Sequence, residues 1–335
     1  MAKSEVLIEM PDFPEKYNLG MVEVEKVSSR VRPKQFLHID ESECILCEGC
    51  VDICPWKCIH YLSNDAIEDS INVESTEENR RDWRQLLFQT SSISDYISGV
   101  ILFDETLRQS TSDGEKIVDL LSKNNIIPGI KVDKSTHPLP LSREEVMTEG
   151  LDGLRRRLEE YLDIGAKFTK WRAVINISES LPSNYAINVN SNLLAIYAAL
   201  SQEVGLVPIV EPEVLMDGEH SIEQCLEVTR KTLNKVFEDL AESNVYLEGI
   251  VLKPNMVLSG KDATNRADAK TVAKYTIDVL KETVPSSVPG IAFLSGGQED
   301  QESIDNLNEI NIYAHQNNAP WELTYSYGRG LQAAP

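Results

Sequence analysis

Short apolar runs alternate with amphipathic stretches from residue 77 almost to residue 329. The runs have the length and composition of buried strands, and the stretches between them repeat apolar residues at helical spacing. We expect strands at 99–103, 126–132, 168–175, 206–213, 247–253, 290–297 and 322–329. We expect helices at 77–88, 113–123, 149–162, 191–203, 221–242, 268–283 and 302–309. Such repeats give parallel strands joined by crossover helices, and eight strands would close a (β/α)8 TIM barrel.

Composition narrows the class of protein. The 335 residues suffice for one large α/β domain and a small module. No run of eighteen apolar residues predicts a membrane span, and the N-terminus lacks an apolar signal core, so we expect a cytoplasmic protein. The net charge of −22 argues against nucleic acid as a partner.

Five of the six cysteines lie between Cys44 and Cys58. Cys44, Cys47, Cys50 and Cys54 are followed by Pro55, and this C-x2-C-x2-C-x3-C-P spacing is specific for a [4Fe–4S] cluster. A zinc site and a motif that holds no cluster are the alternatives. The bunching suits metal chemistry in a reducing compartment better than a disulfide framework.

The cysteine segment resembles the first half of a bacterial two-cluster ferredoxin. In that family the fourth cysteine of each run binds the other cluster. No second run follows here, so Cys54 or Cys58 would have to complete the ligand set. Because residues 64–78 are polar and acidic, we place a boundary near residue 70, which gives segments 1–70 and 71–335.

Charged residues and glycines stand at the C-terminal ends of the expected strands. In a barrel these ends meet on one face, where active sites form. The residues are Lys131, Asp133, Lys170, Arg172, Glu211, Glu213, Lys253, Ser295, Gly296, Gly297, Gly328 and Arg329. Each alone could be a solvated loop residue, but these lysine and arginine side chains, together with two glycine-containing turns, suit a phosphorylated substrate.

Lys253 ends an apolar run and precedes Pro254, which stops a strand. Apolar surroundings disfavour an ammonium ion, so we expect a lowered pKa for Lys253 and a nucleophilic amine. A second ammonium at Lys170 would lower the pKa of Lys253 further, and Glu211 could move protons. The alternative is a strand-end lysine that points into water.

Residues 73–329 resemble class I fructose-1,6-bisphosphate aldolase. The matching stretches are Gly99-Val-Ile-Leu-Phe-Asp-Glu-Thr-Leu, Gly129-Ile-Lys-Val-Asp, Gly150-Leu-Asp-Gly-Leu, Lys170-Trp-Arg-Ala-Val, Val207-Pro-Ile-Val-Glu-Pro-Glu-Val, Leu252-Lys-Pro-Asn-Met, Phe293-Leu-Ser-Gly-Gly and Ser326-Tyr-Gly-Arg. The resemblance implies a glycolytic Schiff-base lyase that splits fructose 1,6-bisphosphate into dihydroxyacetone phosphate and glyceraldehyde 3-phosphate. It implies no cofactor for that reaction and a cytosolic homotetramer.

The resemblance also implies a role for each site residue. Lys253 would form the imine, Glu211 would serve carbinolamine dehydration, and Lys170 and Glu213 would support the charge pattern. The residues implied to bind one phosphate are Ser295, Gly296, Gly328 and Arg329. Lys131 and Arg172 would bind the other end of the substrate.

The chain departs from this family at both ends. It lacks the family's first strand, which ends in Ala-Asp-Glu-Ser, and a C-terminal extension, so we expect a barrel whose first strand and last helix are missing or replaced. Leu37-His-Ile-Asp-Glu-Ser shares Asp-Glu-Ser with that strand, so Asp40 could replace the family's acid; we favour Asp40 as a residue of the ferredoxin-like segment. Because of these departures, we expect the chain to bind fructose 1,6-bisphosphate far better than it cleaves it. The alternatives are an iron–sulfur electron-transfer protein with an inactive barrel and a non-catalytic binding protein.

Overall fold

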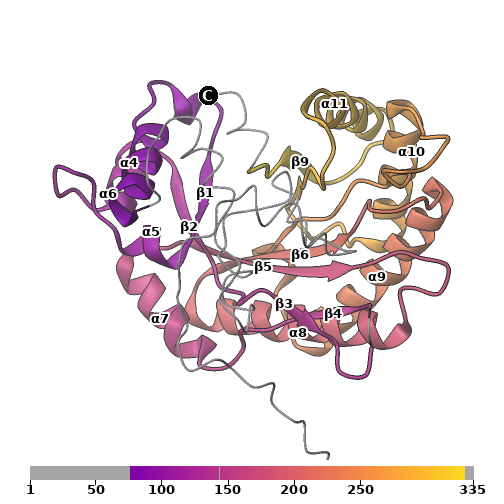
Figure 1. The fold of residues 1–335 in the computed structure, drawn as a ribbon, viewed down its shortest axis with the longest axis horizontal. Coiled ribbons are helices and arrows are strands. Elements are labelled where there is room, and N and C mark those ends of the chain that lie inside the picture. The colour runs from indigo at the N-terminus through magenta and orange to yellow at the C-terminus, as the bar shows by residue number, and fades with distance from the viewer. Residues whose placement is uncertain (1–75, 143, 329–335) are drawn as a thin grey trace, which may run out of the picture. The chain divides into compact units, whose positions relative to one another are not determined.

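The structure is a computed structural model, and it describes residues 76–142 and 144–328. The cysteine motif, Asp40 and Arg329 lie outside the described residues, so the expectations for them stay predictions. The strands are β1 (Gly99–Leu102), β2 (Ile127–Lys131), β5 (Phe168–Ile175), β6 (Val207–Val214), β7 (Val251–Leu252), β8 (Gly290–Phe293) and β9 (Glu322–Tyr325), and Figure 1 labels β1, β2, β5, β6 and β9. They form one sheet in the order β1-β2-β5-β6-β7-β8-β9, and every neighbouring pair is parallel. The predicted α/β fold with seven parallel strands is confirmed.

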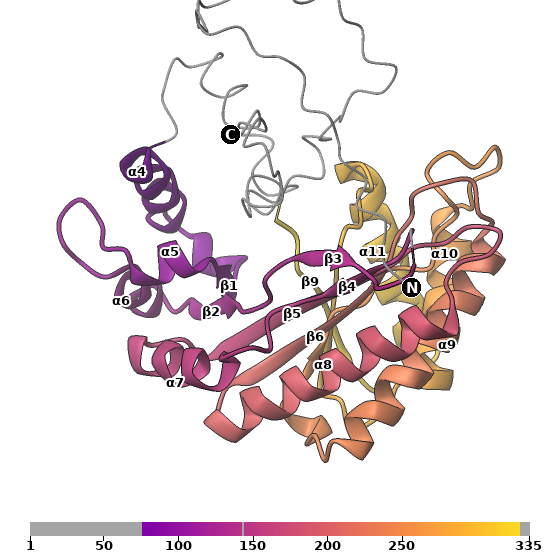
Figure 2. The ribbon, with the colours of Figure 1, turned by 60° about the horizontal axis from the view of Figure 1, so that its bottom comes forward.

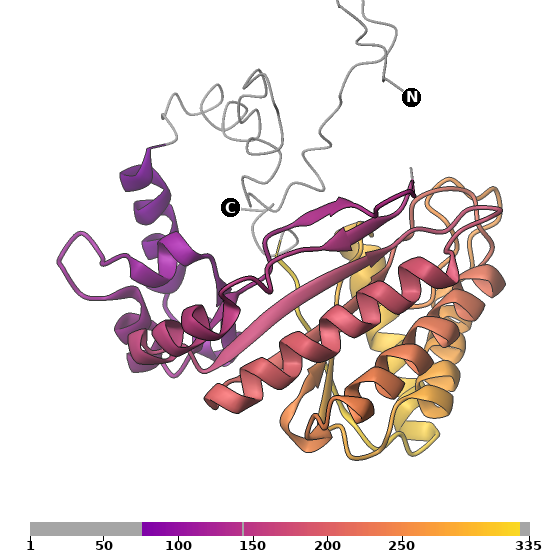
Figure 3. The same ribbon diagram turned by 90° about the horizontal axis from the view of Figure 1, so that it is seen from below.

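The helices cover one face of the curled sheet, as Figure 2 and Figure 3 show for those that follow β5 and β6. The α-helices of the described residues are α4 (Glu77–Phe88), α5 (Asp104–Arg108), α6 (Ile117–Lys123), α7 (Leu154–Ile164), α8 (Asn184–Val204), α9 (Ile222–Glu242), α10 (Ala269–Thr283) and α11 (Asp300–Gln316). α8 packs against β5 and β6, and α9 packs against α8 and α10. A two-stranded hairpin, β3 (Thr136–Pro138) with β4 (Val146–Thr148), lies beside β5 and α8.

The alternation of side chains along β5 separates the core from the charged face of the sheet. Trp171 is fully buried and stacks on Tyr197 of α8, with ring centroids 5.5 Å apart. Thr169 shares a hydrogen bond with the same tyrosine, at 3.0 Å. Because successive strand residues point to opposite faces, Lys170 and Arg172 lie on the face away from α8.

The two edges of the sheet approach each other through one side chain. The Tyr325 hydroxyl, at the end of β9, donates a hydrogen bond to the carbonyl oxygen of Tyr96, just before β1, at 3.1 Å. Within residues 76–142 and 144–328, β1 and β9 do not pair as strands, so the described sheet is curled but open.

Several predicted boundaries were correct. The helix at 77–88 and the strand at 168–175 match α4 and β5 residue for residue. The helix predicted from 221 begins at Ile222, because Ser221 caps it: the Ser221 side chain accepts from Gln224 N, and the Gln224 side chain accepts from Ser221 N.

The strand predicted at 247–253 was too long, since only Val251–Leu252 is strand and Leu247–Gly249 forms a 3-10 turn. The amide side chain of Gln202 binds both the Tyr246 N–H (2.9 Å) and its carbonyl (2.7 Å), so the end of α8 holds this backbone. Apolar composition alone does not show such a contact.

Two helix boundaries were wrong for local reasons. α7 begins at Leu154 rather than 149, because Gly150 and Gly153 have φ of +130° and +67°, outside helical geometry. α8 begins at Asn184 rather than 191: the Ser183 side chain caps it by accepting from Ala186 N at 3.1 Å. Its first turns carry polar residues that hide the apolar period.

The other helix predictions were also imprecise. α6 begins at Ile117 rather than 113, after a turn closed by the Ser110–Lys116 bridge. α11 runs on to Gln316, past the predicted end at 309. The short helix α5 and the hairpin were not predicted, because each is too short to establish a period.

Gly260 is a position where a side chain has no room. An added Cβ would lie 2.2 Å from the Gly218 carbonyl oxygen and 2.8 Å from His220 N, both backbone atoms. We expect Gly260→Ala to lower the free energy of unfolding by about 1–3 kcal/mol, measured in urea. Gly290→Ala is the control, since its Cβ would meet its nearest neighbour at an ordinary 3.6 Å. Equal unfolding free energies for the two variants would contradict the prediction.

Candidate active site

Five charged side chains of alternating sign form a line that crosses β2, β5, β6 and the end of β7; we call it the ionic chain. Lys170 and Glu211 lie within β5 and β6 rather than at their C-terminal ends, where the sequence had led us to expect them. Its members are Lys131, Asp133, Lys170, Glu211 and Lys253, and their side chains are at most 11 % exposed. Lys131 Nζ lies 2.8 Å from Asp133 Oδ1, and Lys170 Nζ lies 3.5 Å from Asp133 Oδ2. Lys170 Nζ also lies 3.2 Å from Glu211 Oε2, and Lys253 Nζ donates to Glu211 Oε1.

The strand register explains why these side chains meet. Parallel pairing puts Lys131 beside Lys170 and Arg172 beside Glu211. The backbone N–H of Lys253 donates to the Val210 carbonyl at 2.8 Å, which brings Lys253 next to the strand position of Glu211. Lys253 is therefore buried against a carboxylate, and the alternative of a lysine pointing into water is wrong.

The ionic chain favours the charged forms of Asp133, Lys170 and Glu211. Burial disfavours the Glu211 carboxylate, but the ammonium groups of Lys170 and Lys253 outweigh it and lower the Glu211 pKa. Burial likewise opposes the charge of Asp133, whose pKa is lowered by Lys170 and Lys131. Burial would lower the pKa of Lys170, but Glu211 and Asp133 raise it. Lys170 and Lys253 thus contact the same carboxylate, that of Glu211. The lowered pKa that we expect for Lys253 stays a prediction.

A second ion pair, between Arg172 and Glu213, lies one step along the same strands. Arg172 Nε donates to Glu213 Oε2. The Arg172 side chain is 34 % exposed and that of Glu213 is 7 % exposed, so the guanidinium reaches toward solvent from a buried carboxylate. The pKa of Arg172 is raised because the charge of Glu213 outweighs the effect of burial.

The loop after Lys253 is fixed by Asn255, which the sequence analysis did not single out. Its Oδ1 accepts from Val214 N at 3.2 Å, and its Nδ2 donates to Thr229 Oγ1 at 3.2 Å and to the Met256 carbonyl at 2.9 Å. Asn255 is 4 % exposed, and it ties the end of β7 to β6 and α9. An amide two residues after the strand-end lysine was the only sequence sign of this role.

The predicted phosphate-binding glycines occupy turns after β8 and β9. Gly296 and Gly297 have φ of +63° and +86°, which permits a tight turn directly after Ser295. Leu294 N donates to the Pro254 carbonyl at 3.2 Å, so this turn begins beside the residue that follows Lys253. Ser326 N donates to the Phe293 carbonyl at 2.8 Å, which brings the segment leading to Gly328 beside β8.

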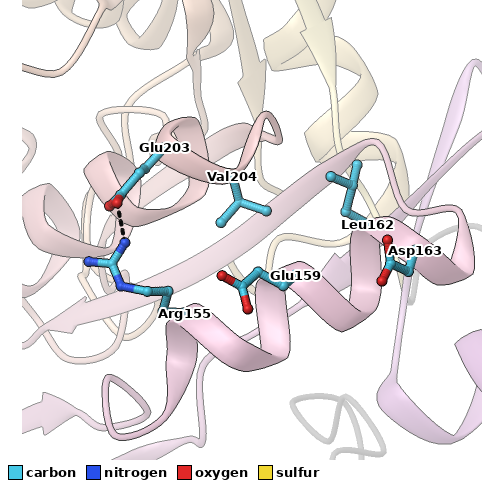
Figure 4. Close-up of a pocket in the computed structure, with 6 residues that line it drawn as sticks. All are labelled: Arg155, Glu159, Leu162, Asp163, Glu203 and Val204. Atoms are coloured by element: carbon cyan, nitrogen blue, oxygen red, sulfur yellow. Dashed lines mark ion pairs between the residues drawn. The ribbon is translucent and has the colours of Figure 1, made fainter.

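A surface hollow of about 260 Å³ lies elsewhere, between α7 and α8 (Figure 4). The lining residues are Arg155, Glu159, Leu162, Asp163, Glu203 and Val204. Arg155 and Glu203 form an ion pair across it, and no predicted site residue lines it.

Residues 76–142 and 144–328 contain no group of three or more His, Cys, Asp or Glu side chains placed to hold a metal ion. In the same part of the chain no helix is both long and apolar enough to cross a membrane.

Known proteins are similar to this chain over most of its length. The family model described as fructose-bisphosphate aldolase class-I matches residues 64–335, and the model for a 4Fe-4S binding domain matches residues 37–60. A probable fructose-bisphosphate aldolase class 1 of Xanthomonas axonopodis pv. citri is 56 % identical over 266 residues, which are 79 % of this chain and 78 % of the relative. The chloroplastic fructose-bisphosphate aldolase 2 of Pisum sativum is 51 % identical over 79 % of this chain and 74 % of its own.

A solved structure extends the similarity to the fold. The fructose-bisphosphate aldolase of Plasmodium falciparum, solved in complex with TRAP and a small-molecule inhibitor, superposes with a TM-score of 0.78. It is 47 % identical, and the match covers 82 % of this chain and 78 % of the other.

Proposed function

This chain belongs to the class I fructose-bisphosphate aldolase family, and we propose from that premise that it cleaves fructose 1,6-bisphosphate into dihydroxyacetone phosphate and glyceraldehyde 3-phosphate. The observation that carries the proposal is the buried contact of Lys253 with Glu211, beside Lys170. A strand-end lysine bonded to a carboxylate has the partner that imine chemistry needs.

The chemistry begins at Lys253. Glu211 takes a proton from the Lys253 ammonium, and the free amine adds to the ketone carbon of the substrate to give a carbinolamine. Glu211 returns the proton to the departing hydroxyl, so water leaves and a protonated imine forms. A base then removes the proton of the C4 hydroxyl, the C3–C4 bond breaks and its electron pair moves to the positive nitrogen, which releases glyceraldehyde 3-phosphate and leaves an enamine. The proton is returned to the enamine carbon, and water hydrolyses the resulting protonated imine to free dihydroxyacetone phosphate and Lys253.

The charges around Lys253 suit a substrate with a phosphate at each end. Lys131 and Arg172 would bind one end, and Ser295, Gly296, Gly328 and Arg329 the phosphate at the other. Backbone amides in a glycine turn and arginine are effective phosphate donors. Glu213, bonded to Arg172, would orient that guanidinium.

Three further parts of the proposal concern the whole chain. We propose that residues 71–335 form a TIM-barrel domain in which another segment completes the seven described strands, and that the protein is a cytoplasmic homotetramer. The family's usual assembly supports the tetramer. Asp40 stays a candidate for the acid that the family carries on its first strand.

The test is a turnover assay with purified protein, coupled to detection of glyceraldehyde 3-phosphate, with fructose 1,6-bisphosphate affinity measured by calorimetry on the same sample. We expect both cleavage and binding. Binding without cleavage would favour a non-catalytic sugar-phosphate protein and would overturn the proposal.

We propose a second property for residues 1–70: a ferredoxin-like segment in which Cys44, Cys47, Cys50 and Cys54 hold a [4Fe–4S] cluster. Four thiolates at this spacing are the donor set that such a cluster takes, and the match to a 4Fe-4S binding domain at 37–60 supports it. A bound cluster would supply one-electron transfer, which the aldolase reaction does not need.

We expect this cluster to be labile, because the sequence has no second cysteine run to supply the ligand that each run of a two-cluster ferredoxin gives to the other cluster. Anaerobic reconstitution should give less than one cluster per chain, lost in air, by iron analysis and visible absorbance. Cys47→Ser should reduce the iron bound, whereas Cys225→Ser, a buried cysteine on α9, should not. A full cluster that survives aerobic purification would contradict the expected lability, and equal iron in the two variants would contradict the ligand assignment.

A further inference from the structure

Asp133 links two lysines of the ionic chain, and the chemistry proposed above gives it no role. Asp133 Oδ1 lies 2.8 Å from Lys131 Nζ, and Asp133 Oδ2 lies 3.5 Å from Lys170 Nζ. Two backbone N–H groups also donate to it, that of Ser135 at 3.3 Å and that of Arg172 at 3.4 Å. With 7 % exposure, this carboxylate is held from four sides and has little freedom to move.

Asp133 affects Lys170 because it is one of two carboxylate partners of that lysine. Lys170 forms one ion pair with Asp133 and another with Glu211. Without Asp133, the Lys170 ammonium would keep only Glu211, which is also the partner of Lys253. Lys170 would then compete with Lys253 for one carboxylate, and the Lys253–Glu211 contact would lengthen or lose its geometry.

The position of Asp133 affects Lys131 through competition. Both Asp133 Oδ1 and the Asp133 carbonyl oxygen, at 3.2 Å, accept from Lys131 Nζ. A phosphate that approaches Lys131 must therefore share this ammonium with, or displace, a carboxylate of the same sign that is already in contact. The ionic chain contains three ammonium and two carboxylate groups, so removal of one carboxylate raises its net charge from +1 to +2.

We propose that Asp133 is a positioning residue of the reaction, which holds Lys170 beside Glu211 and competes with the substrate's phosphate for Lys131. The inference rests on the proposed function, because it assigns Lys131 to phosphate and Glu211 with Lys253 to the chemistry. Asp133 thus moderates anion affinity while it keeps the proton-transfer group in place.

The test is Asp133→Asn, which removes the charge and keeps the shape. We expect kcat for fructose 1,6-bisphosphate to fall about 10²-fold, as for a misplaced catalytic group. We expect inorganic phosphate, measured as a competitive inhibitor, to bind about tenfold more tightly, because Lys131 is freed and a repelling charge is gone. A merely structural residue would not move these two quantities in opposite directions.

Asp239→Asn is the matched control. Asp239 is 4 % exposed and forms an ion pair with the partly exposed Lys235 at 2.9 Å on α9, so its removal also takes a buried carboxylate away from a lysine. We expect neither kcat nor phosphate affinity to change in this variant. The proposal is overturned if Asp133→Asn leaves kcat unchanged, or if its phosphate affinity is unchanged or weaker.

Asp133→Glu keeps the test decisive if Asp133→Asn does not fold. The longer carboxylate shifts Lys170 but still occupies Lys131, so kcat should fall while phosphate affinity stays that of the wild type. An unchanged kcat, or tighter phosphate binding, would overturn the proposal. Phosphate binding by calorimetry needs no turnover, so an inactive wild-type protein would refute the proposed function and still leave the competition for Lys131 measurable.

Discussion

Lys253→Arg should reduce fructose 1,6-bisphosphate cleavage by roughly 10⁴- to 10⁶-fold, the range seen when a covalent nucleophile is removed. The guanidinium keeps the positive charge beside Glu211 but stays protonated, so it cannot form an imine. Because the phosphate-binding groups come from other strands, we expect the affinity for fructose 1,6-bisphosphate to change far less than kcat. Steady-state kinetics and calorimetry on the same preparation measure the two quantities.

The covalent adduct gives an independent measure of the same prediction. Borohydride added with dihydroxyacetone phosphate should attach the reduced adduct to the peptide that contains Lys253, and the Lys253→Arg protein should gain none. Lys235→Arg is the control, since Lys235 forms ion pairs with Glu238 and Asp239 on α9 and should leave turnover unchanged. An adduct on another lysine, or none on a folded wild type, would refute the role of Lys253.

Glu211→Gln should lower kcat by about 10²–10⁴-fold, the usual effect of losing a general acid–base group. Glutamine fills the same space but can neither take the proton of the Lys253 ammonium nor return it to the leaving hydroxyl. It also removes the carboxylate that Lys170 and Lys253 share. We expect imine trapping to slow with turnover, because both depend on carbinolamine dehydration.

The control for Glu211→Gln must separate catalysis from folding, because Glu211 is 3 % exposed. Asp239→Asn removes a carboxylate that is buried to a similar degree and paired with a lysine. Thermal unfolding by circular dichroism should show both variants folded at the assay temperature. A folded Glu211→Gln protein with the kcat of the wild type would rule out the proposed proton transfer.

The sequence predicted the order and type of the strands well, because each buried strand of a parallel sheet is an apolar run of its own. Gly99–Leu102 is such a run, and its predicted start was correct. The boundaries predicted for Phe168–Ile175 were also correct, although Lys170 and Arg172 interrupt its apolar residues. The sequence predicted β7 poorly, because the side chain of Gln202 holds the Tyr246 backbone in a turn. A contact between residues 44 positions apart leaves no trace in local periodicity.

The candidate site was partly predictable for the same reason. Strand ends converge in this fold, so Lys131, Lys170, Glu211 and Lys253 could be grouped before any geometry was known. The pairing among them was not predictable, since Asp133 could face either the loop or the site. Asn255 was missed because a buried amide after a strand looks the same in sequence as a solvated loop residue.

The order of the strands in the sheet repeats their order in the chain, and this has a consequence for how the protein is made. Each strand after β1 pairs with one that has already left the ribosome, so the sheet can grow as the chain emerges from its N-terminal side. Lys131, Lys170 and Glu211 would assemble first. Lys253 follows Glu211 by 42 residues, roughly 2–8 s of synthesis at ~5–20 residues per second. The ionic chain therefore receives its reactive amine last, after the carboxylate that binds it is already in place.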